Sequence, residues 1–141
     1  MRFIRVFFVL IILLLLMPMS ASSLAQESEP KEYEPWELPR LVGDFALHAE
    51  LFDPKGVPLE GLKVDAVTTI RVTEEQALDR DYALYVYIDN GAVFSKQNVR
   101  LPYKLKWNFR GLSKGAHTMM LVFATKDNQK GVVRLKLMVQ H

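Results

Sequence analysis

The chain contains no cysteine, and this absence excludes several kinds of chemistry at once. Without thiols the protein has no disulfide framework, no thiolate nucleophile and no lipidated cysteine anchor. Apolar burial alone must therefore stabilise its core, and a chain of this length can bury enough surface for that.

The chain also lacks an excess of charge outside its first residues. It holds 18 Lys and Arg against 16 Asp and Glu, and Arg2 and Arg5 account for the difference. The charges are nevertheless segregated, because residues 26–90 carry 6 basic and 15 acidic side chains, whereas residues 91–141 carry 10 basic and 1 acidic. Nucleic-acid binding needs a strongly exposed basic surface, so we expect no nucleic acid as a partner.

No arrangement of residues typical of an enzyme is visible. Ser113 and the other serines lie outside any Gly-x-Ser-x-Gly motif, and adjacent Glu74 and Glu75 would point to opposite faces of a strand. The histidines lack the spacing of a metal site; they are His48, His117 and His141. A glycine-rich phosphate loop is also missing. We therefore expect no catalytic activity, no metal and no cofactor.

The first 25 residues have the pattern of a secretory signal peptide. Arg2 and Arg5 form a basic head, residues 6–17 are apolar, and small residues stand before the expected cleavage after Ala25. An uncleaved membrane anchor is the alternative, although this run of 12 residues is shorter than the roughly 20 that a membrane span needs. We expect a secreted protein, periplasmic or at the cell surface, with no membrane span after cleavage.

Residues 26–43 hold three prolines and five glutamates without any regular period. This composition predicts a flexible tether ahead of a single domain over residues 44–141. The alternative is that Trp36, Leu38 and Leu41 dock on the domain or on a partner, as proline-rich recognition segments do.

Apolar and polar residues alternate with a period of two through most of residues 44–141, which is typical of half-buried strands. We predict strands over residues 44–52, 62–73, 82–88, 103–110, 117–124 and 133–140, with a short edge strand or loop over 92–100. Turn signals separate these segments, for example at residues 53–56 and 89–91. About seven short strands without a long helical pattern predict an all-β antiparallel sandwich, and a small closed barrel is the alternative.

Five short motifs follow one another in the second half of the chain. They are Leu84-Tyr85-Val86-Tyr87-Ile88-Asp89, Pro102-Tyr103, Trp107-Asn108, Gly111-Leu112 and Gly115-Ala116-His117-Thr118-Met119. Their order and spacing over residues 64–139 resemble the bacterial immunoglobulin-like domains of secreted and cell-surface proteins. The resemblance implies an immunoglobulin-like β-sandwich. Phe123 and Thr125 depart from it, because the family usually has a small residue and an aspartate there.

Four residues of these motifs are expected to have structural roles. Trp107 lies mid-strand among apolar residues and should fill the centre of the sandwich. The resemblance implies that Leu112, Gly115 and His117 take the place of a tyrosine corner, in which an aromatic side chain bonds back to the connecting loop. A metal or catalytic role for His117 is the alternative.

In an immunoglobulin-like sandwich the third, sixth and seventh strands share a sheet, so their outward residues should form one exposed face. These residues are Tyr85, Tyr87, Met120, Val122, Arg134, Lys136 and Met138. Protein interfaces favour Tyr, Met and Arg, and we predict that this face binds a protein partner in the cell envelope or outside the cell. Alternatively, these side chains form cross-strand pairs on a solvated sheet.

A basic set offers a second surface, made of Arg100, Lys104, Lys106, Arg110 and Lys114. It suits an anionic polysaccharide or phospholipid, unless the acidic first half of the chain neutralises it. The sequence thus predicts a non-catalytic secreted module for protein binding or assembly. A carbohydrate-binding module is the alternative, and an accessory subunit of an enzyme is a third possibility.

Overall fold

The computed structural model describes Glu32, residues 43–76 and residues 78–141. The expected signal peptide and nearly all of the expected tether lie outside these residues. Within them, no helix is long and apolar enough to cross a membrane.

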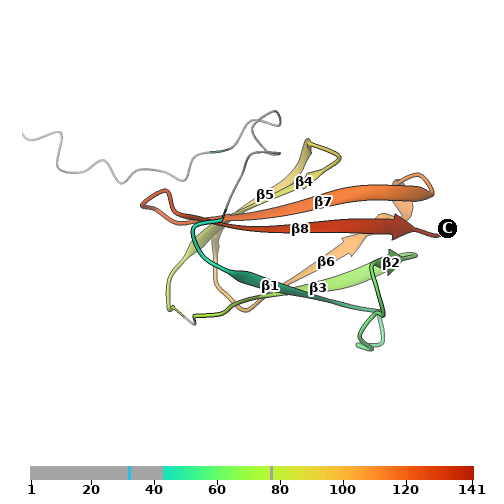
Figure 1. Cartoon of the computed structure of the whole chain (residues 1–141), viewed down its shortest axis with the longest axis horizontal. Helices are drawn as coiled ribbons and strands as arrows, with labels where there is room; N and C mark the ends of the chain where they lie inside the picture. Colours follow the sequence, from blue (N-terminus) through green and yellow to red (C-terminus); the bar gives the residue numbers. More distant parts are fainter. Residues whose placement is uncertain (1–31, 33–42, 77) are drawn as a thin grey trace, which may run out of the picture.

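Eight strands form two sheets that face each other (Figure 1). The three-stranded sheet has the order β1 (Leu47–Phe52), β3 (Val67–Glu74), β6 (Tyr103–Asn108). The five-stranded sheet has the order β2 (Lys63–Val64), β8 (Lys130–Val139), β7 (Gly115–Ala124), β4 (Tyr82–Ile88), β5 (Gly91–Val99). This arrangement confirms the immunoglobulin-like β-sandwich, with eight strands rather than about seven and with two separate sheets rather than a barrel.

The residues predicted as one strand over 62–73 form two strands in different sheets. Lys63 and Val64 pair in parallel with Met138 and Val139 of β8, after which the chain crosses to the other sheet and becomes β3. Inward residues of both strands are buried in the same core, so the apolar period continues across the change of sheet. The period of two therefore could not reveal it, and the sandwich is not wholly antiparallel.

One predicted alternative is decided by the structure, and one other boundary differs from the prediction. Residues 92–100, expected as an edge strand or loop, form most of the nine-residue edge strand β5. Residues 109 and 110, expected as strand, belong to the 3₁₀ helix η3 (Phe109–Gly111). The side chain of Asn108 accepts a hydrogen bond from the backbone N–H of Arg110 at 3.1 Å, which caps this helix and ends β6.

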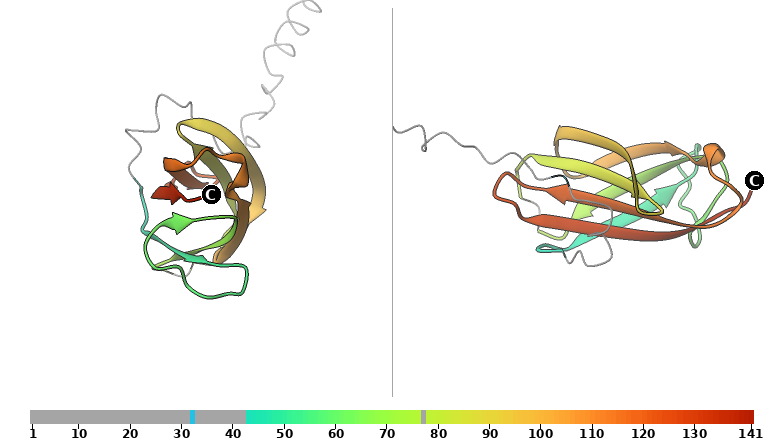
Figure 2. Two further views of the ribbon diagram at one scale, coloured as in Figure 1. Left: turned by 90° about the vertical axis from the view of Figure 1, so that its right-hand side faces the viewer. Right: turned by 90° about the horizontal axis from the view of Figure 1, so that it is seen from above.

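The core lies between the sheets, and its central aromatic rings are those of Phe109 and Phe123, which are fully buried. The prediction that Trp107 fills the centre is wrong, because this residue is only half-buried. β6 is an edge strand, so its inward residues meet the open side of the sandwich. There the Trp107 ring packs edge to face against Phe94 of β5, with 6.2 Å between ring centroids. Figure 2 shows the two layers from the end and from above.

The first described residues of the domain are joined to the start of β8. The backbone N–H of Asp44 donates to the carbonyl of Lys130 at 2.6 Å, and the Asp44 carboxylate accepts from the Lys130 N–H at 2.8 Å. Next to this link, Phe45 and Leu47 pack directly on Gly131, where a Cβ would meet Leu47 at 2.6 Å. Gly131 therefore lets the beginning of the domain approach β8 closely.

The turn between β7 and β8 contains Thr125, one of the two departures from the immunoglobulin-like pattern. Thr125 is buried, and its hydroxyl donates to the carboxylate of Asp127 and accepts from the backbone N–H of Gln129. The hydrogen bond from Thr125 lowers the pKa of Asp127. The carboxylate in this turn thus belongs to Asp127, and position 125 supplies a hydroxyl that binds it.

Candidate functional site

The predicted partner-binding residues do share one face of the five-stranded sheet. Tyr85 is opposite Val122 in the register and Tyr87 is opposite Met120, while Arg134 of β8 is opposite Met120 from the other side. Their exposure differs from the prediction. Arg134, Lys136 and Met138 are exposed, but the other four are buried, with exposed fractions of 5% for Tyr85, 1% for Tyr87, 4% for Met120 and 0% for Val122. The expectation of a fully exposed face was therefore wrong.

His117 lies on β7 and joins two loops at one end of the sandwich. Its Nδ1 lies 2.6 Å from Oδ2 of Asp89, in the β4–β5 turn, and its Nε2 lies 2.7 Å from the backbone carbonyl oxygen of Ser113. The hydrogen bonds to Asp89 and to the Ser113 carbonyl raise the pKa of His117. The bond to Ser113 returns to the loop four residues upstream, as in a tyrosine corner.

Ser113, His117 and Asp89 are also the residue types of a hydrolytic triad, although no motif in the sequence indicates that they lie close together. The Ser113 hydroxyl lies 3.3 Å from Nε2 of His117. A general base needs a lone pair on this nitrogen to take the hydroxyl proton. Here Nε2 donates its own proton to the Ser113 carbonyl, and Nδ1 donates to Asp89. This arrangement suits a charged structural link and leaves Ser113 without a base.

The predicted basic set does not form one surface. Arg100 pairs with Asp81 at 2.9 Å and with Asp79 at 3.1 Å, so acidic residues of the first half neutralise it. Arg110 lies in η3, and Lys114 lies in the loop before β7. Lys104 and Lys106 are exposed on the outer side of β6.

Lys104 and Lys106 line a pocket of about 300 Å³ on the outer face of the three-stranded sheet. The register places Lys104 beside Arg71 of β3 and Lys106 beside Thr69, and Thr69 is beside Phe52 of β1. The β1–β2 connection closes the pocket with Asp53, Pro54 and Gly56. We call this the basic pocket. Arg71 and Phe52 were not among the residues predicted from the sequence, because only the strand register, which the sequence does not specify, brings them to this pocket.

The charge of the basic pocket is only partly compensated. Arg71 pairs with Glu50 at 2.8 Å, and its guanidinium carbon lies 5.8 Å from the centre of the Phe52 ring. The Nε of Arg71 is buried and finds no hydrogen-bond acceptor among the described residues. Among the residues that the structure describes, neither Lys104 nor Lys106 forms an ion pair. The carboxylate of Asp53 accepts from backbone N–H groups of its own turn. The pocket therefore presents two ammonium groups that have no ion-pair partner among the described residues, beside an aromatic ring.

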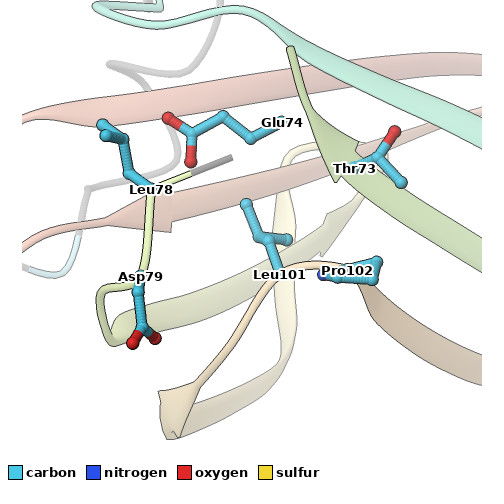
Figure 3. A pocket seen from close by; sticks show the side chains of 6 residues that line it. All are labelled: Thr73, Glu74, Leu78, Asp79, Leu101 and Pro102. Carbon is cyan, nitrogen blue, oxygen red and sulfur yellow. The ribbon is translucent and has the colours of Figure 1, made fainter. Parts of the chain in front are cut away.

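A second pocket, of about 350 Å³, lies beside the end of β3 (Figure 3). Its lining is Thr73, Glu74, Leu78, Asp79, Leu101 and Pro102. Both carboxylates are engaged, because Glu74 accepts from Arg80 at 2.9 Å and from the Tyr82 hydroxyl, and Asp79 pairs with Arg100. Burial, followed by the hydrogen bond to Glu74, raises the pKa of Tyr82. Over the described ranges, no group of three His, Asp or Glu residues could hold a metal ion. This pocket offers a ligand less free charge than the basic pocket.

No family model matches the chain, and no characterised protein matches it in sequence. The bacterial immunoglobulin-like family therefore remains a prediction.

Solved structures with a similar fold include the fibronectin(III)-like modules of CbhA from Clostridium thermocellum, at 16% identity over 66% of this chain and 97% of that one, with a TM-score of 0.43. The soluble domain of PmoD from a Methylocystis species is 15% identical over 70% of this chain and 94% of that one, with a TM-score of 0.49. A lytic polysaccharide monooxygenase from Jonesia denitrificans is 12% identical over 62% and 63%, with a TM-score of 0.46. The likeness to these structures concerns the fold alone.

Proposed function

We propose that this protein is a secreted, non-catalytic binding module that takes an anionic ligand in the basic pocket. The observation that carries the proposal is that Arg71, Lys104 and Lys106, from two neighbouring strands, line one pocket. Among these three residues, only Arg71 forms an ion pair with Glu50. Secretion is inferred from the signal-peptide pattern of the first 25 residues. The absence of catalysis is inferred from the sequence and from the hydrogen-bond partners of His117, which are two acceptors.

The shape and chemistry of the basic pocket favour an acidic saccharide. Its volume of about 300 Å³ is at the lower end of the range for small-molecule sites, so it accommodates a few sugar units rather than a folded partner. Lys104 and Lys106 stand two residues apart on one side of a strand, a separation of about 7 Å. Two ammonium groups at that spacing suit two carboxylate or sulfate groups carried by one chain. The Phe52 ring adds an apolar surface for the sugar.

The proposal can be tested by calorimetry on residues 26–141 with heparin, polygalacturonate and neutral dextran. We expect the two acidic polymers to bind and dextran not to bind, with affinity that falls as salt rises. A Lys104→Gln, Lys106→Gln variant should lose binding by tenfold or more, because each lost ammonium group removes a charge-assisted contact worth about 1–3 kcal/mol.

A matched control is available in the same basic set. An Arg110→Gln, Lys114→Gln variant removes the same charge outside the pocket and should bind almost as well as the wild type. Equal losses in the two variants would mean that net charge alone attracts the polymers, and the pocket would then have no role. Equal binding of dextran and polygalacturonate by the wild type would also overturn the proposal.

Protein binding remains a second candidate, and it is favoured by the edge of β5, which pairs with no further strand among the described residues. β5 is a nine-residue edge strand on which Val93 is 47% exposed and Phe94 is 38% exposed. A strand of a partner can add to such an edge through backbone hydrogen bonds. A Val93→Lys variant should then lose a protein that co-purifies from envelope extract with the wild type. A Val57→Lys variant, altered at another exposed valine, should keep it; retention by both would exclude this edge.

A further inference from the structure

One row of charged side chains crosses the outer face of the three-stranded sheet at the basic pocket. Glu50 of β1 is opposite Arg71 of β3 in the register, and Arg71 is in turn opposite Lys104 of β6. All three side chains lie on the face opposite to Ile70 and Leu105, which are buried in the core. The strand order β1-β3-β6 therefore places one negative and two positive charges side by side.

The two neighbours of Arg71 in this row carry charges of opposite sign. Side chains directly opposite each other in adjacent strands have Cβ atoms about 5 Å apart, so unlike charges attract there and like charges repel. Glu50 pairs with Arg71 at 2.8 Å on one side. On the other side stands Lys104, which has no ion-pair partner among the described residues. An anion between Arg71 and Lys104 would replace this repulsion by two attractive contacts.

The ion pair between Glu50 and Arg71 is open to exchange. The side chain of Arg71 is 42% exposed and that of Glu50 is 51% exposed. Exposed ion pairs contribute little to stability and are screened by salt. The Nε of Arg71 has no acceptor among the described residues, so Glu50 leaves at least one donor of the guanidinium unused. A second carboxylate can therefore compete with Glu50 for Arg71.

A carboxylate inside the basic pocket has more partners than Glu50 has. Arg71 and Lys104 both line the pocket, so one carboxylate can accept from the guanidinium and from the ammonium group. Glu50 stands on the far side of Arg71, because β1 and β6 are separated by two strand spacings, about 10 Å. It pairs with Arg71 and not with Lys104. The position between the two cations thus favours a carboxylate from the ligand over Glu50.

We propose that Glu50 is an internal competitor for the ligand of the basic pocket. Its carboxylate occupies Arg71 in the free protein, and a carboxylate of the ligand displaces it and binds between Arg71 and Lys104. Lys106, two residues further along β6, holds a second acidic group of the same chain. The ligand is accordingly a saccharide whose acidic groups are carboxylates, as in uronic acids. This inference rests on the proposed function, because it concerns the same pocket.

Calorimetry with polygalacturonate on residues 26–141 tests the competition. The measurement is made at about 0.15 M salt, which screens the effect of distant charges. Glu50→Gln should raise the affinity about two- to fivefold, the range expected when an exposed competing ion pair is removed. Glu75→Gln removes the same charge at an exposed position just beyond β3 and should bind like the wild type. No gain in Glu50→Gln, or equal gains in both variants, would overturn the proposal.

A double-mutant cycle separates competition for Arg71 from simple repulsion of the polymer by Glu50. Arg71→Gln should weaken binding several-fold, because the carboxylate loses its guanidinium partner. Adding Glu50→Gln to Arg71→Gln should then change nothing, because no guanidinium is left to compete for. A gain that persists in the Arg71→Gln background would show that Glu50 acts by repulsion, and the proposal would be wrong. The thermal midpoints of the four proteins check that all are folded.

The methyl ester of polygalacturonate provides a control on the ligand. It carries the same sugars without free carboxylates, so neither the wild type nor Glu50→Gln should bind it. Binding of the ester by Glu50→Gln would mean that loss of Glu50 opens the pocket to sugars in general. Displacement by a carboxylate would then be excluded.

The proposed function and this inference fail separately. If Lys104→Gln, Lys106→Gln loses binding while Glu50→Gln matches the wild type, the pocket binds its ligand without displacing Glu50, and only the inference fails. If Glu50→Gln binds polygalacturonate and the wild type does not, Glu50 is a competitor, and the proposed function fails for the wild-type chain. If neither protein binds it, both fail.

Discussion

Oδ2 of Asp89 lies 2.6 Å from Nδ1 of His117, although 28 residues separate them in the chain. Asp89 also accepts the backbone N–H of Thr118 at 2.9 Å through its other carboxylate oxygen. The hydrogen bonds from Thr118 and then from His117 lower the pKa of Asp89. The hydrogen bonds to Asp89 and then to the Ser113 carbonyl raise the pKa of His117. One carboxylate thus links the β4–β5 turn to β7.

This link should make stability depend on pH in both directions. His117 has a raised pKa in the folded chain, so its contribution is complete below about 6.5, the ordinary value, and is lost as pH rises through the folded pKa. Asp89 has a lowered pKa, so its contribution is complete above about 3.9 and is lost as pH falls through the folded pKa. We expect the thermal midpoint to be highest between about pH 4 and pH 6.5.

Substitution of the carboxylate isolates the contribution of this link. In an Asp89→Asn variant, the decrease of the thermal midpoint above about pH 6.5 should become shallower, because the amide does not favour a charged imidazole. A His48→Gln variant, which changes an exposed histidine elsewhere, should retain the wild-type slope. The assignment would be wrong if Asp89→Asn followed the wild-type curve.

Replacing Glu74 by Gln should destabilise the domain by about 1–3 kcal/mol, because the partly buried Arg80 and the buried Tyr82 lose a charged acceptor. The side chain of Glu74 is only 3% exposed. Glu50 is the matched control, since it also pairs with an arginine but is 51% exposed. Glu50→Gln should change the free energy of unfolding by less than about 1 kcal/mol. Urea denaturation measures both, and equal effects would contradict the importance of burial.

A methyl group at Gly131 should be poorly tolerated. The Cβ of Gly131→Ala would overlap Phe45 and lie 2.6 Å and 2.8 Å from atoms of Leu47. We expect a loss of about 1–3 kcal/mol from overpacking. At Gly111 a Cβ meets nothing within 4 Å, so Gly111→Ala should be nearly neutral. Thermal unfolding of the two variants measures the difference, and a neutral Gly131→Ala would show that β1 can move away from β8.

The two large aromatic residues near the end of β6 should differ in their contributions. Phe109 is fully buried, so Phe109→Ala should cost about 3–5 kcal/mol. Trp107 is half-buried at the open side of the sandwich, and Trp107→Ala should cost about 1–3 kcal/mol. Denaturant unfolding provides the comparison. A larger loss for Trp107→Ala would place Trp107 in the centre of the core after all.

Local signals in the sequence were sufficient to predict the central strands of the five-stranded sheet. β8 alternates clearly, β4 and β7 are largely apolar on both faces, and Asp89 and Asn90 adopt φ values of 50° and 67°, as a two-residue hairpin turn requires. The change of sheet between Val64 and Val67 was not predictable in this way, because residues on both sides of it face one core.

The candidate sites depend on relationships that no single segment contains. The basic pocket arises because β3 lies between β1 and β6, which places Arg71 beside Lys104. The alternation of Tyr85 and Tyr87 correctly indicated a separate face, but whether a face is exposed depends on what lies over it. The alternation of residues along a strand does not show whether other atoms lie over its outer face.

β8 runs the length of the domain, and this has a mechanical consequence. Asp44 is bonded at the beginning of β8, and His141 follows its last residues at the opposite end (Figure 1). A pulling force between these two points acts along the strands, while the hydrogen bonds between β7 and β8 lie across it. All ten residue pairs of that ladder are then loaded together in shear rather than opened one at a time. A force along the long axis of the domain would therefore meet the resistance of the whole β7–β8 ladder rather than that of single residue pairs.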